Sequence, residues 1–326
     1  MARQHTVAEL VSRAQEGEPR AVARLISMVE DASPRLREVA AALAPHTGRA
    51  QVVGLTGSPG VGKSTSTSAL VTALRAQGKR VGVLAVDPSS PFSGGALLGD
   101  RVRMQDHATD RGVFIRSMAT RGHLGGLSWA TPQALRVLDA AGCDVVLLET
   151  VGVGQSEIEV VSLADTTVVL LAPGMGDGIQ AAKAGILEIA DLFVVNKADR
   201  DGADQTVRDL RYMLSLGERK ERDGSVWKAP IVKTIASKGV GIDDVVEKID
   251  EHRAWMDSSG ARERRRQNRA ESEVEAITLE QMRQRIGDVR GGDALPELAK
   301  RVVAGEIDPY TAADELVETL ASSGSD

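Results

Sequence analysis

The 326-residue sequence has a single cysteine, Cys143, so it cannot form a disulfide within the chain. Aromatic residues make up only 2%, which weighs against binding single-stranded nucleic acid by base stacking. Lysine and arginine (40) do not outnumber aspartate and glutamate (46), so the totals indicate no basic face. The apolar runs are far shorter than a membrane span, and the amino terminus lacks the apolar stretch of a signal peptide. These absences favour a cytoplasmic location and partners other than nucleic acid or membrane.

From residue 51 onward, apolar stretches alternate with helical patterns, which is typical of a mostly parallel sheet covered by helices on both faces. The core must be built from aliphatic side chains, and Cys143 beside an apolar run is expected to belong to it. The predicted strands are Val52–Thr56, Arg80–Val86, Val113–Ser117, Val145–Glu149, Thr167–Leu171, Phe193–Asn196 and Ile231–Thr234.

Helical patterns without strands flank this region on both sides. At the amino end, Thr6 and Glu9 have the spacing of a capping box, and Ser33 before Pro34 predicts the start of a further helix. After about residue 242 the patterns are again helical only. We therefore expect an N-terminal helical extension (1–48), an α/β domain (49–257) and a C-terminal helical extension (258–326) for docking or dimerisation.

The segment 57–64, GSPGVGKS, fits the phosphate-binding P-loop and lies between a predicted strand and a predicted helix. In that context the main-chain N–H groups surround a triphosphate, Lys63 neutralises the β- and γ-phosphates, and the Ser64 hydroxyl binds Mg²⁺. The fold class is therefore an α/β P-loop NTPase. Partitioning and arsenite-type ATPases carry a lysine directly after the first P-loop glycine, whereas this sequence has Ser58 there, which argues against that class. The predicted phosphate-binding residues are Gly57, Ser58, Pro59, Gly60, Val61, Gly62, Lys63, Ser64 and Thr65.

The segment 196–199, NKAD, indicates guanine as the base. The Asp199 carboxylate can accept hydrogen bonds from the N1–H and amino group of guanine, a donor pair that adenine lacks. Lys197 can lie over the base, and Asn196 can connect this loop to the P-loop. After the last predicted strand, a main-chain N–H of Ala236, Ser237 or Lys238 can meet guanine O6. These features predict binding of GTP and GDP.

Asp87 and Glu149 lie at or beside the carboxyl ends of predicted strands, where ligands bind in such sheets. Asp100 lies in the connection between two predicted strands. Asp87, Asp100 and Glu149 are candidates for the Mg²⁺ shell, with Glu149 also able to hold the attacking water. Gly152 N–H can sense the γ-phosphate. Each acid has an alternative interpretation as a helix cap or a charge on a surface loop. The predicted catalytic set is Lys63, Glu149, Gly152 and Asp100.

The residue after Gly152 is Val153, whereas small regulatory GTPases place a water-orienting glutamine there. Gln155 comes two positions later. We therefore expect slow intrinsic hydrolysis of GTP that a partner or a dimer contact accelerates.

Taken together, the segments GSPGVGKST, VDPSS, LLGDR, FIRSMATRGHLGG, ETVGVGQSE, GDGIQAAKAGILEIAD and NKAD resemble the MeaB/ArgK/MMAA family of P-loop GTPases. The resemblance implies a homodimeric GTPase chaperone for adenosylcobalamin-dependent methylmalonyl-CoA mutase, which assists cofactor loading, protection or reactivation. It also implies Mg²⁺ roles for Ser64, Asp87, Asp100 and Glu149. The segment Gly176–Asp191 would be a further switch, with Gln155, Gln180 and Lys183 as contacts to nucleotide or partner; without the resemblance, Lys183 is a lysine on a helix face.

Two other functions remain open at this point. A metal-delivery GTPase would need soft ligands near the switches, and Cys143 and the five histidines (His5, His46, His107, His123 and His252) show no ligand spacing. A kinase that uses GTP as donor would need a second substrate pocket, for which the sequence offers no feature.

Overall fold

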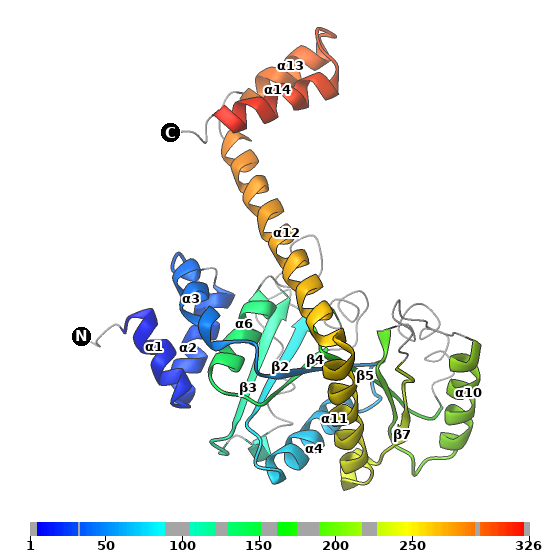
Figure 1. The fold of residues 1–326 in the computed structure, drawn as a ribbon. Helices are drawn as coiled ribbons and strands as arrows, with labels where there is room; N and C mark the ends of the chain where they lie inside the picture. Colours follow the sequence, from blue (N-terminus) through cyan, green and yellow to red (C-terminus); the bar gives the residue numbers. More distant parts are fainter. Residues whose placement is uncertain are drawn as a thin grey trace. The chain divides into compact units, whose positions relative to one another are not determined.

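The computed structural model describes residues 5–31, 33–88, 105–107, 109–120, 130–150, 162–174, 189–216, 227–290 and 294–322. The chain divides into two compact units, Met1–Glu263 and Arg264–Asp326. The first unit contains the sheet (Figure 1).

A parallel sheet of seven strands forms the centre of the first unit, in the order β3-β2-β4-β1-β5-β6-β7. The α/β class is therefore confirmed. Every predicted strand is present, and the largest difference is in β3, which continues to Thr120. The strands are β1 (Gln51–Thr56), β2 (Val81–Pro88), β3 (Val113–Thr120), β4 (Val145–Thr150), β5 (Thr166–Leu171), β6 (Leu192–Val195) and β7 (Ile231–Lys233).

Two helices, α4 (Lys63–Ala76) and α11 (Ile242–Ser259), cover one face of the sheet. Their apolar side chains pack on alternate strand residues such as Leu55 and Leu147, which are fully buried. Alternate residues of a strand point to opposite faces, so the neighbouring residues face the other helical layer. The sheet is thus buried on both sides, as its nearly continuous apolar strands predicted.

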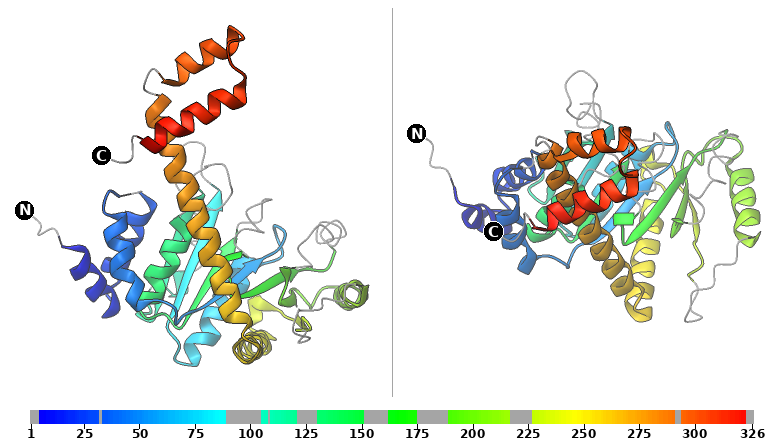
Figure 2. Two further views of the ribbon diagram at one scale, coloured as in Figure 1. Left: turned by 45° about the horizontal axis from the view of Figure 1, so that its top comes forward. Right: turned by 90° about the horizontal axis from the view of Figure 1, so that it is seen from above.

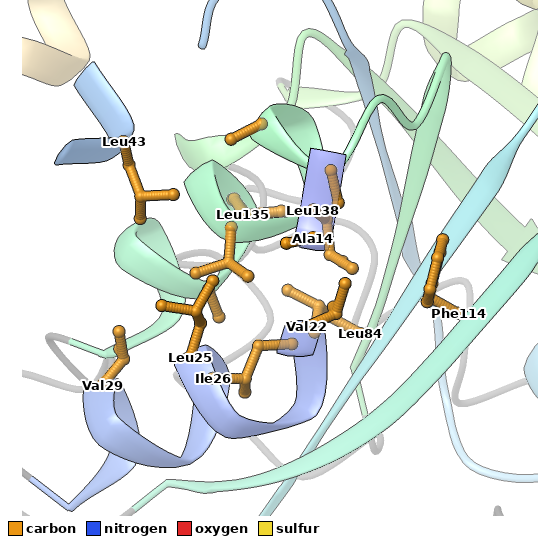
Figure 3. Close-up of a cluster of buried hydrophobic side chains, with 14 of the residues drawn as sticks. Ala14, Val22, Leu25, Ile26, Val29, Leu43, Leu84, Phe114, Leu135 and Leu138 are labelled. Atoms are coloured by element: carbon orange, nitrogen blue, oxygen red, sulfur yellow. The ribbon is translucent and has the colours of Figure 1, made fainter. Parts of the chain in front are cut away.

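On the other face, α2 (Pro19–Glu30) and α6 (Ala130–Ala140) pack against the sheet, and α1 (Val7–Gln15) and α3 (Leu36–Leu43) pack on these two helices. At a separate place, α10 (Ala203–Leu216) covers the same face. Figure 3 shows Leu25 of α2 close to Leu135 of α6, with Leu84 of β2 in the same cluster. Full burial of one such leucine stabilises the fold by about 1.5–3 kcal/mol. The N-terminal helices therefore belong to the core of the first unit.

The ends of the N-terminal helices agree with the sequence in one case and differ in another. Thr6 and Glu9 form the predicted capping box of α1. Helix α3, however, begins at Leu36, with Arg35 and not Ser33 at its N-cap. The Ser33 carbonyl accepts the Leu36 N–H at 2.8 Å, so Pro34 lies in a turn that precedes the helix. The predicted start was two residues too early.

Three aspartates fix the amino-terminal edge of the sheet. Each aspartate directly precedes one strand. Its carboxylate accepts a hydrogen bond from a main-chain N–H of a neighbouring strand, or of the residue that directly precedes that neighbouring strand. This arrangement aligns the strands so that their carboxyl ends meet at the opposite edge. The pairs are Asp144 with Arg80 (2.7 Å), Asp165 with Val52 (3.0 Å) and Asp191 with Thr167 (2.9 Å).

The second unit contains most of α12 (Ala261–Arg290), with α13 (Ala294–Val303) and α14 (Pro309–Ser322). Helices α13 and α14 lie side by side (Figure 2), joined by an ion pair of 2.6 Å between Arg301 and Glu315. None of the side chains described in this unit is buried. Among all described helices of the chain, none is long and apolar enough to cross a membrane.

Candidate functional site

The P-loop connects β1 to α4 at the carboxyl edge of the sheet. Gly57 has φ +141°, and a Cβ there would lie 2.3 Å from the main-chain oxygen of Leu170 on β5. Gly62, at the N-cap of α4, has φ +94°, and a Cβ there would lie 2.5 Å from Asn196 Nδ2. Both positions therefore require glycine, because any side chain would be strained and would collide with a neighbouring strand or loop.

Lys63, the first residue of α4, is buried and turns back over the loop. Its Nζ donates to the carbonyl of Gly57 at 2.5 Å and to that of Ser58 at 3.2 Å. The loop thus closes around its own lysine. An ammonium with three donors in this position can also contact the oxygens of a phosphate bound in the loop.

Glu149, near the end of β4, accepts hydrogen bonds from two hydroxyl groups of α4. Ser64 Oγ donates to Oε1 at 2.6 Å, and Thr67 Oγ1 donates to Oε2 at 2.9 Å. The carboxylate is only 1% exposed, and a buried charge needs such donors. The register of the sheet brings Glu149 beside Leu55 of β1, and hence next to the loop that follows this strand. Sequence analysis did not identify Thr67, although its i+3 spacing from Ser64 places both hydroxyls on one side of α4.

Asn196, directly after β6, connects three segments of the site. Its Nδ2 donates to the carbonyl of Val61 in the P-loop at 2.9 Å. Its Oδ1 accepts from Ala236 N–H at 3.0 Å and from Thr234 Oγ1 at 3.2 Å. The expected connection between NKAD and the P-loop is therefore present, and it includes the segment 236–238.

The other residues of NKAD lie nearer the surface. Lys197 Nζ donates to the Gly60 carbonyl at 2.6 Å, and among the described non-glycine residues only Lys197 has a positive φ, +57°. Asp199 is exposed, with Lys238 Nζ 3.4 Å from its carboxylate. An exposed carboxylate beside a lysine can accept donors from a base that approaches from solvent.

Of the segment 236–238, two main-chain N–H groups already donate within the protein. Ala236 N–H donates to Asn196 Oδ1, and Lys238 N–H donates to the Ile235 carbonyl at 2.8 Å. A base at this position would therefore compete with the bond to Asn196 if it used Ala236 N–H.

Several predicted site residues lie outside the part that the structure describes. Asp87 falls near the end of β2, as expected, but only its backbone is described. The remaining candidates outside the described residues are Asp100, Gly152, Gln155, Gln180 and Lys183, together with Val153 and most of the segment 176–191.

Among the candidate soft metal ligands, His123 lies outside the described residues, and Cys143 lies away from the P-loop. Cys143 precedes β4 at the other end of the sheet, and burial raises the pKa of its thiol to about 12. Within the described ranges, no group of three or more His, Cys, Asp and Glu side chains is placed to hold a metal ion.

Comparison with known proteins agrees with this geometry. The family described as "Methylmalonyl Co-A mutase-associated GTPase MeaB" matches residues 22–290. A putative GTPase of Pyrococcus abyssi is 48% identical over 317 residues, covering 97% of each chain. The mitochondrial "Methylmalonic aciduria type A homolog" of Mus musculus is 34% identical, covering 94% of this chain and 78% of that protein. The crystal structure of a "LAO/AO transport system kinase" matches with TM-score 0.71 and 27% identity, covering 98% of this chain and 99% of that one.

Proposed function

This chain belongs to the MeaB family of GTPases, and we propose that it is a chaperone that binds and hydrolyses GTP to assist adenosylcobalamin-dependent methylmalonyl-CoA mutase. Assistance here means cofactor loading, protection or reactivation of the mutase. The observation that supports the nucleotide part is the Asn196 bridge, which joins the NKAD segment and the segment 236–238 to the P-loop. The mutase part is supported by the description of the family and by the name of the mouse relative.

In the proposed nucleotide site, residues 57–65 hold the phosphates of GTP or GDP. The main-chain N–H groups of the loop and of the first turn of α4 bind anionic oxygens, since the N-terminus of a helix is positively polarised. Lys63 contributes the balancing charge without a large movement, because it already lies against Gly57 and Ser58.

The proposed base site consists of Asn196, Lys197, Asp199 and the segment 236–238. Asp199 accepts from guanine, Lys197 lies along the base, and a main-chain N–H of the segment 236–238 meets O6. Exchanging Asp199 for asparagine replaces one carboxylate oxygen with an amide donor, which suits the C2 carbonyl of xanthine in place of the guanine amino group. A loss of GTP affinity in Asp199→Asn together with a gain of XTP affinity, measured by calorimetry, is expected; unchanged GTP affinity would contradict this base site.

We place Mg²⁺, when bound, at Ser64, with Asp87, Asp100 and Glu149 as its neighbouring acids. These are hard oxygen donors of the kind that Mg²⁺ takes, and the ion supplies positive charge at the phosphates. Ser64 donates a hydrogen bond to Glu149, and a hydroxyl oxygen that donates its hydrogen can bind a cation through its lone pairs. Glu149 orients this hydroxyl and is placed to hold a water, and Gly152 N–H is proposed to sense the γ-phosphate.

We propose that hydrolysis is slow in the isolated protein because Val153, not a glutamine, follows Gly152. Gln155, Gln180 and Lys183 are proposed as the residues through which a partner acts. The turnover number with and without the mutase tests this point, and a fast rate that the mutase leaves unchanged would remove it.

We propose that the helical extension at residues 258–326 is the docking and dimerisation region. Residues 1–48 are proposed as an N-terminal extension of the GTPase domain at 49–257, and the proposed location of the protein is the cytoplasm. Support for the first point comes from the absence of any buried side chain among those described in the unit Arg264–Asp326. Val274, Ile277 and Met282 are exposed on α12, and a helix with exposed apolar groups gains stability by covering them. Ile277→Glu is expected to lower the mass measured by light scattering from dimer to monomer.

The chaperone function requires the mutase to distinguish the nucleotide states, since a ligand shifts an equilibrium only by its differential affinity for the two states. The direct experiment measures mutase affinity for the GDP form and for a form loaded with a non-hydrolysable GTP analogue. Different affinities are expected. Equal affinities would overturn the switching model, even if GTP binding itself were demonstrated.

A further inference from the structure

Helix α4 presents two hydroxyl groups to Glu149, but only Ser64 belongs to the P-loop motif. Thr67 lies one turn later, is fully buried, and has its Oγ1 2.9 Å from Glu149 Oε2. Ser64 takes the other oxygen, Oε1, at 2.6 Å. Each oxygen of this buried carboxylate is thus held by a different hydroxyl of the same helix.

The hydroxyl of Thr67 has one proton and two acceptors within reach. Its Oγ1 is 3.0 Å from the carbonyl of Lys63, the usual partner of a threonine in a helix, and 2.9 Å from Glu149. A hydrogen bond to an ionised group is roughly twice as strong as one between neutral groups. The carboxylate is therefore the stronger competitor for the proton.

We propose that Thr67 is a positioning residue for the metal side of the site, acting through Glu149. With Oε2 fixed by Thr67, Oε1 faces Ser64 and accepts its proton. The Ser64 oxygen then directs its lone pairs away from Glu149. This inference rests on the proposed function, in which Ser64 binds Mg²⁺ alongside GTP or GDP.

Without the Thr67 hydroxyl, a charge that is 1% exposed has one donor fewer. Such a carboxylate turns towards other donors, and the orientation of Ser64 is lost with it. Groups that orient metal ligands in this indirect way typically change metal affinity by about 10–100-fold when removed. The effect falls on Mg²⁺ and much less on nucleotide binding without metal, because the phosphates are held mainly by main-chain groups and Lys63.

The test compares Thr67→Val, which has the same shape without the hydroxyl, with Thr67→Ser, which keeps the hydroxyl. The readout is the Mg²⁺ concentration that half-maximally slows dissociation of a fluorescent GDP, which requires no turnover. We expect this concentration to rise about tenfold in Thr67→Val and to stay within about twofold in Thr67→Ser. Affinity for the nucleotide in EDTA should be the same in all three proteins.

Thr72 provides the matched control on the same helix. Its Oγ1 donates to the Ser68 carbonyl at 3.1 Å, the i−4 acceptor that corresponds to the Lys63 carbonyl near Thr67, and Thr72 is exposed. Thr72→Val should leave the Mg²⁺ dependence unchanged. If Thr67→Val and Thr72→Val behave alike, or if Thr67→Ser is as defective as Thr67→Val, the inference is wrong.

Two further variants separate this inference from the proposed function. Ser64→Ala and Glu149→Gln should each raise the required Mg²⁺ concentration. If neither does, the metal does not bind where we propose and the function proposed for these residues fails. If both do while Thr67→Val does not, only the role of Thr67 fails. Thermal unfolding of each variant without nucleotide identifies any that has lost its fold. If Thr67→Val is one of these, the inference is judged on Thr67→Ser, and a rise in the required Mg²⁺ concentration in that variant overturns it.

Discussion

The side-chain amide of Asn196 donates a hydrogen bond of 2.9 Å to the main-chain carbonyl of Val61, 135 residues earlier in the chain. Asn196 is 3% exposed, so both partners are removed from water. A loop that follows the sixth strand thereby holds the loop that follows the first. This bond, with the one from Ala236 N–H to Asn196, joins the predicted phosphate-binding and base-binding segments of the candidate site.

Asn196→Ala removes this bridge and leaves the Val61 carbonyl and the Ala236 N–H without their side-chain partner. Unpaired buried groups cost about 1–3 kcal/mol each, so we expect the free energy of unfolding to fall by about 3 kcal/mol. GTP and GDP should both bind more weakly, because the variant disturbs the loops and not the γ-phosphate. Urea unfolding and calorimetry measure the two effects.

Thr234→Val is the matched control for Asn196→Ala. Thr234 is fully buried and donates only one bond of 3.2 Å to Asn196 Oδ1. Its removal should cost about 1 kcal/mol and leave the bond to Val61 in place. Equal losses of stability and of nucleotide affinity in both variants would show that the bridge to the P-loop is not the important contact.

Gly62→Ala and Gly60→Ala separate backbone strain from collision. Both glycines have a positive φ, +94° and +82°, so alanine costs about 1–2 kcal/mol at either position. A Cβ at Gly60 has no atom within 4 Å, whereas a Cβ at Gly62 lies 2.5 Å from Asn196 Nδ2. We expect Gly62→Ala to lower the free energy of unfolding by at least about 1 kcal/mol more than Gly60→Ala. Identical values in nucleotide-free denaturant titrations would contradict the collision.

Ser66→Ala should stabilise the protein. Ser66 Oγ is buried without a hydrogen-bond partner, in an apolar pocket of about 10 Å³ between α4, α11 and the sheet. Removing an unsatisfied hydroxyl is expected to raise the free energy of unfolding by about 1 kcal/mol. Ser68→Ala gains the same helix propensity but loses a bond of 3.0 Å to His107, so it should not stabilise. The prediction fails if the two variants change unfolding in urea by the same amount.

Cys143 should be unreactive in the folded protein. Burial raises its pKa from 9.0 to about 12, so at pH 8 the thiolate is roughly a thousandfold rarer than in the unfolded chain. Reaction with a disulfide reagent at pH 8 is expected to be slow, and to become fast and stoichiometric in guanidinium chloride. Rapid labelling of the folded protein would show that this thiol is accessible.

The same pKa shift contributes to the pH dependence of stability above pH 9. Because the folded pKa lies above the unfolded value, the unfolded chain loses its proton first as the pH rises. The contribution is fully present below about pH 9 and is lost as the pH approaches 12. Compared with Cys143→Ala, the wild-type chain should therefore lose stability more steeply over this range.

The sequence alone was sufficient to predict the α/β class, all seven strands and the two loops that carry the nucleotide motifs. These properties depend on local patterns: apolar strands, P-loop spacing after β1 and NKAD after β6. Local patterns failed at the start of α3, where a turn through Pro34 precedes the helix.

Tertiary structure decided which distant groups meet. Thr67 reaches Glu149 across 82 residues of sequence, and no short motif contains both. The partner of Asn196 and the unpaired hydroxyl of Ser66 likewise depend on which strands and helices pack against each other. Residue type and spacing specify what a side chain can do, but its donors, acceptors and burial are set by neighbours that only the folded sheet brings together.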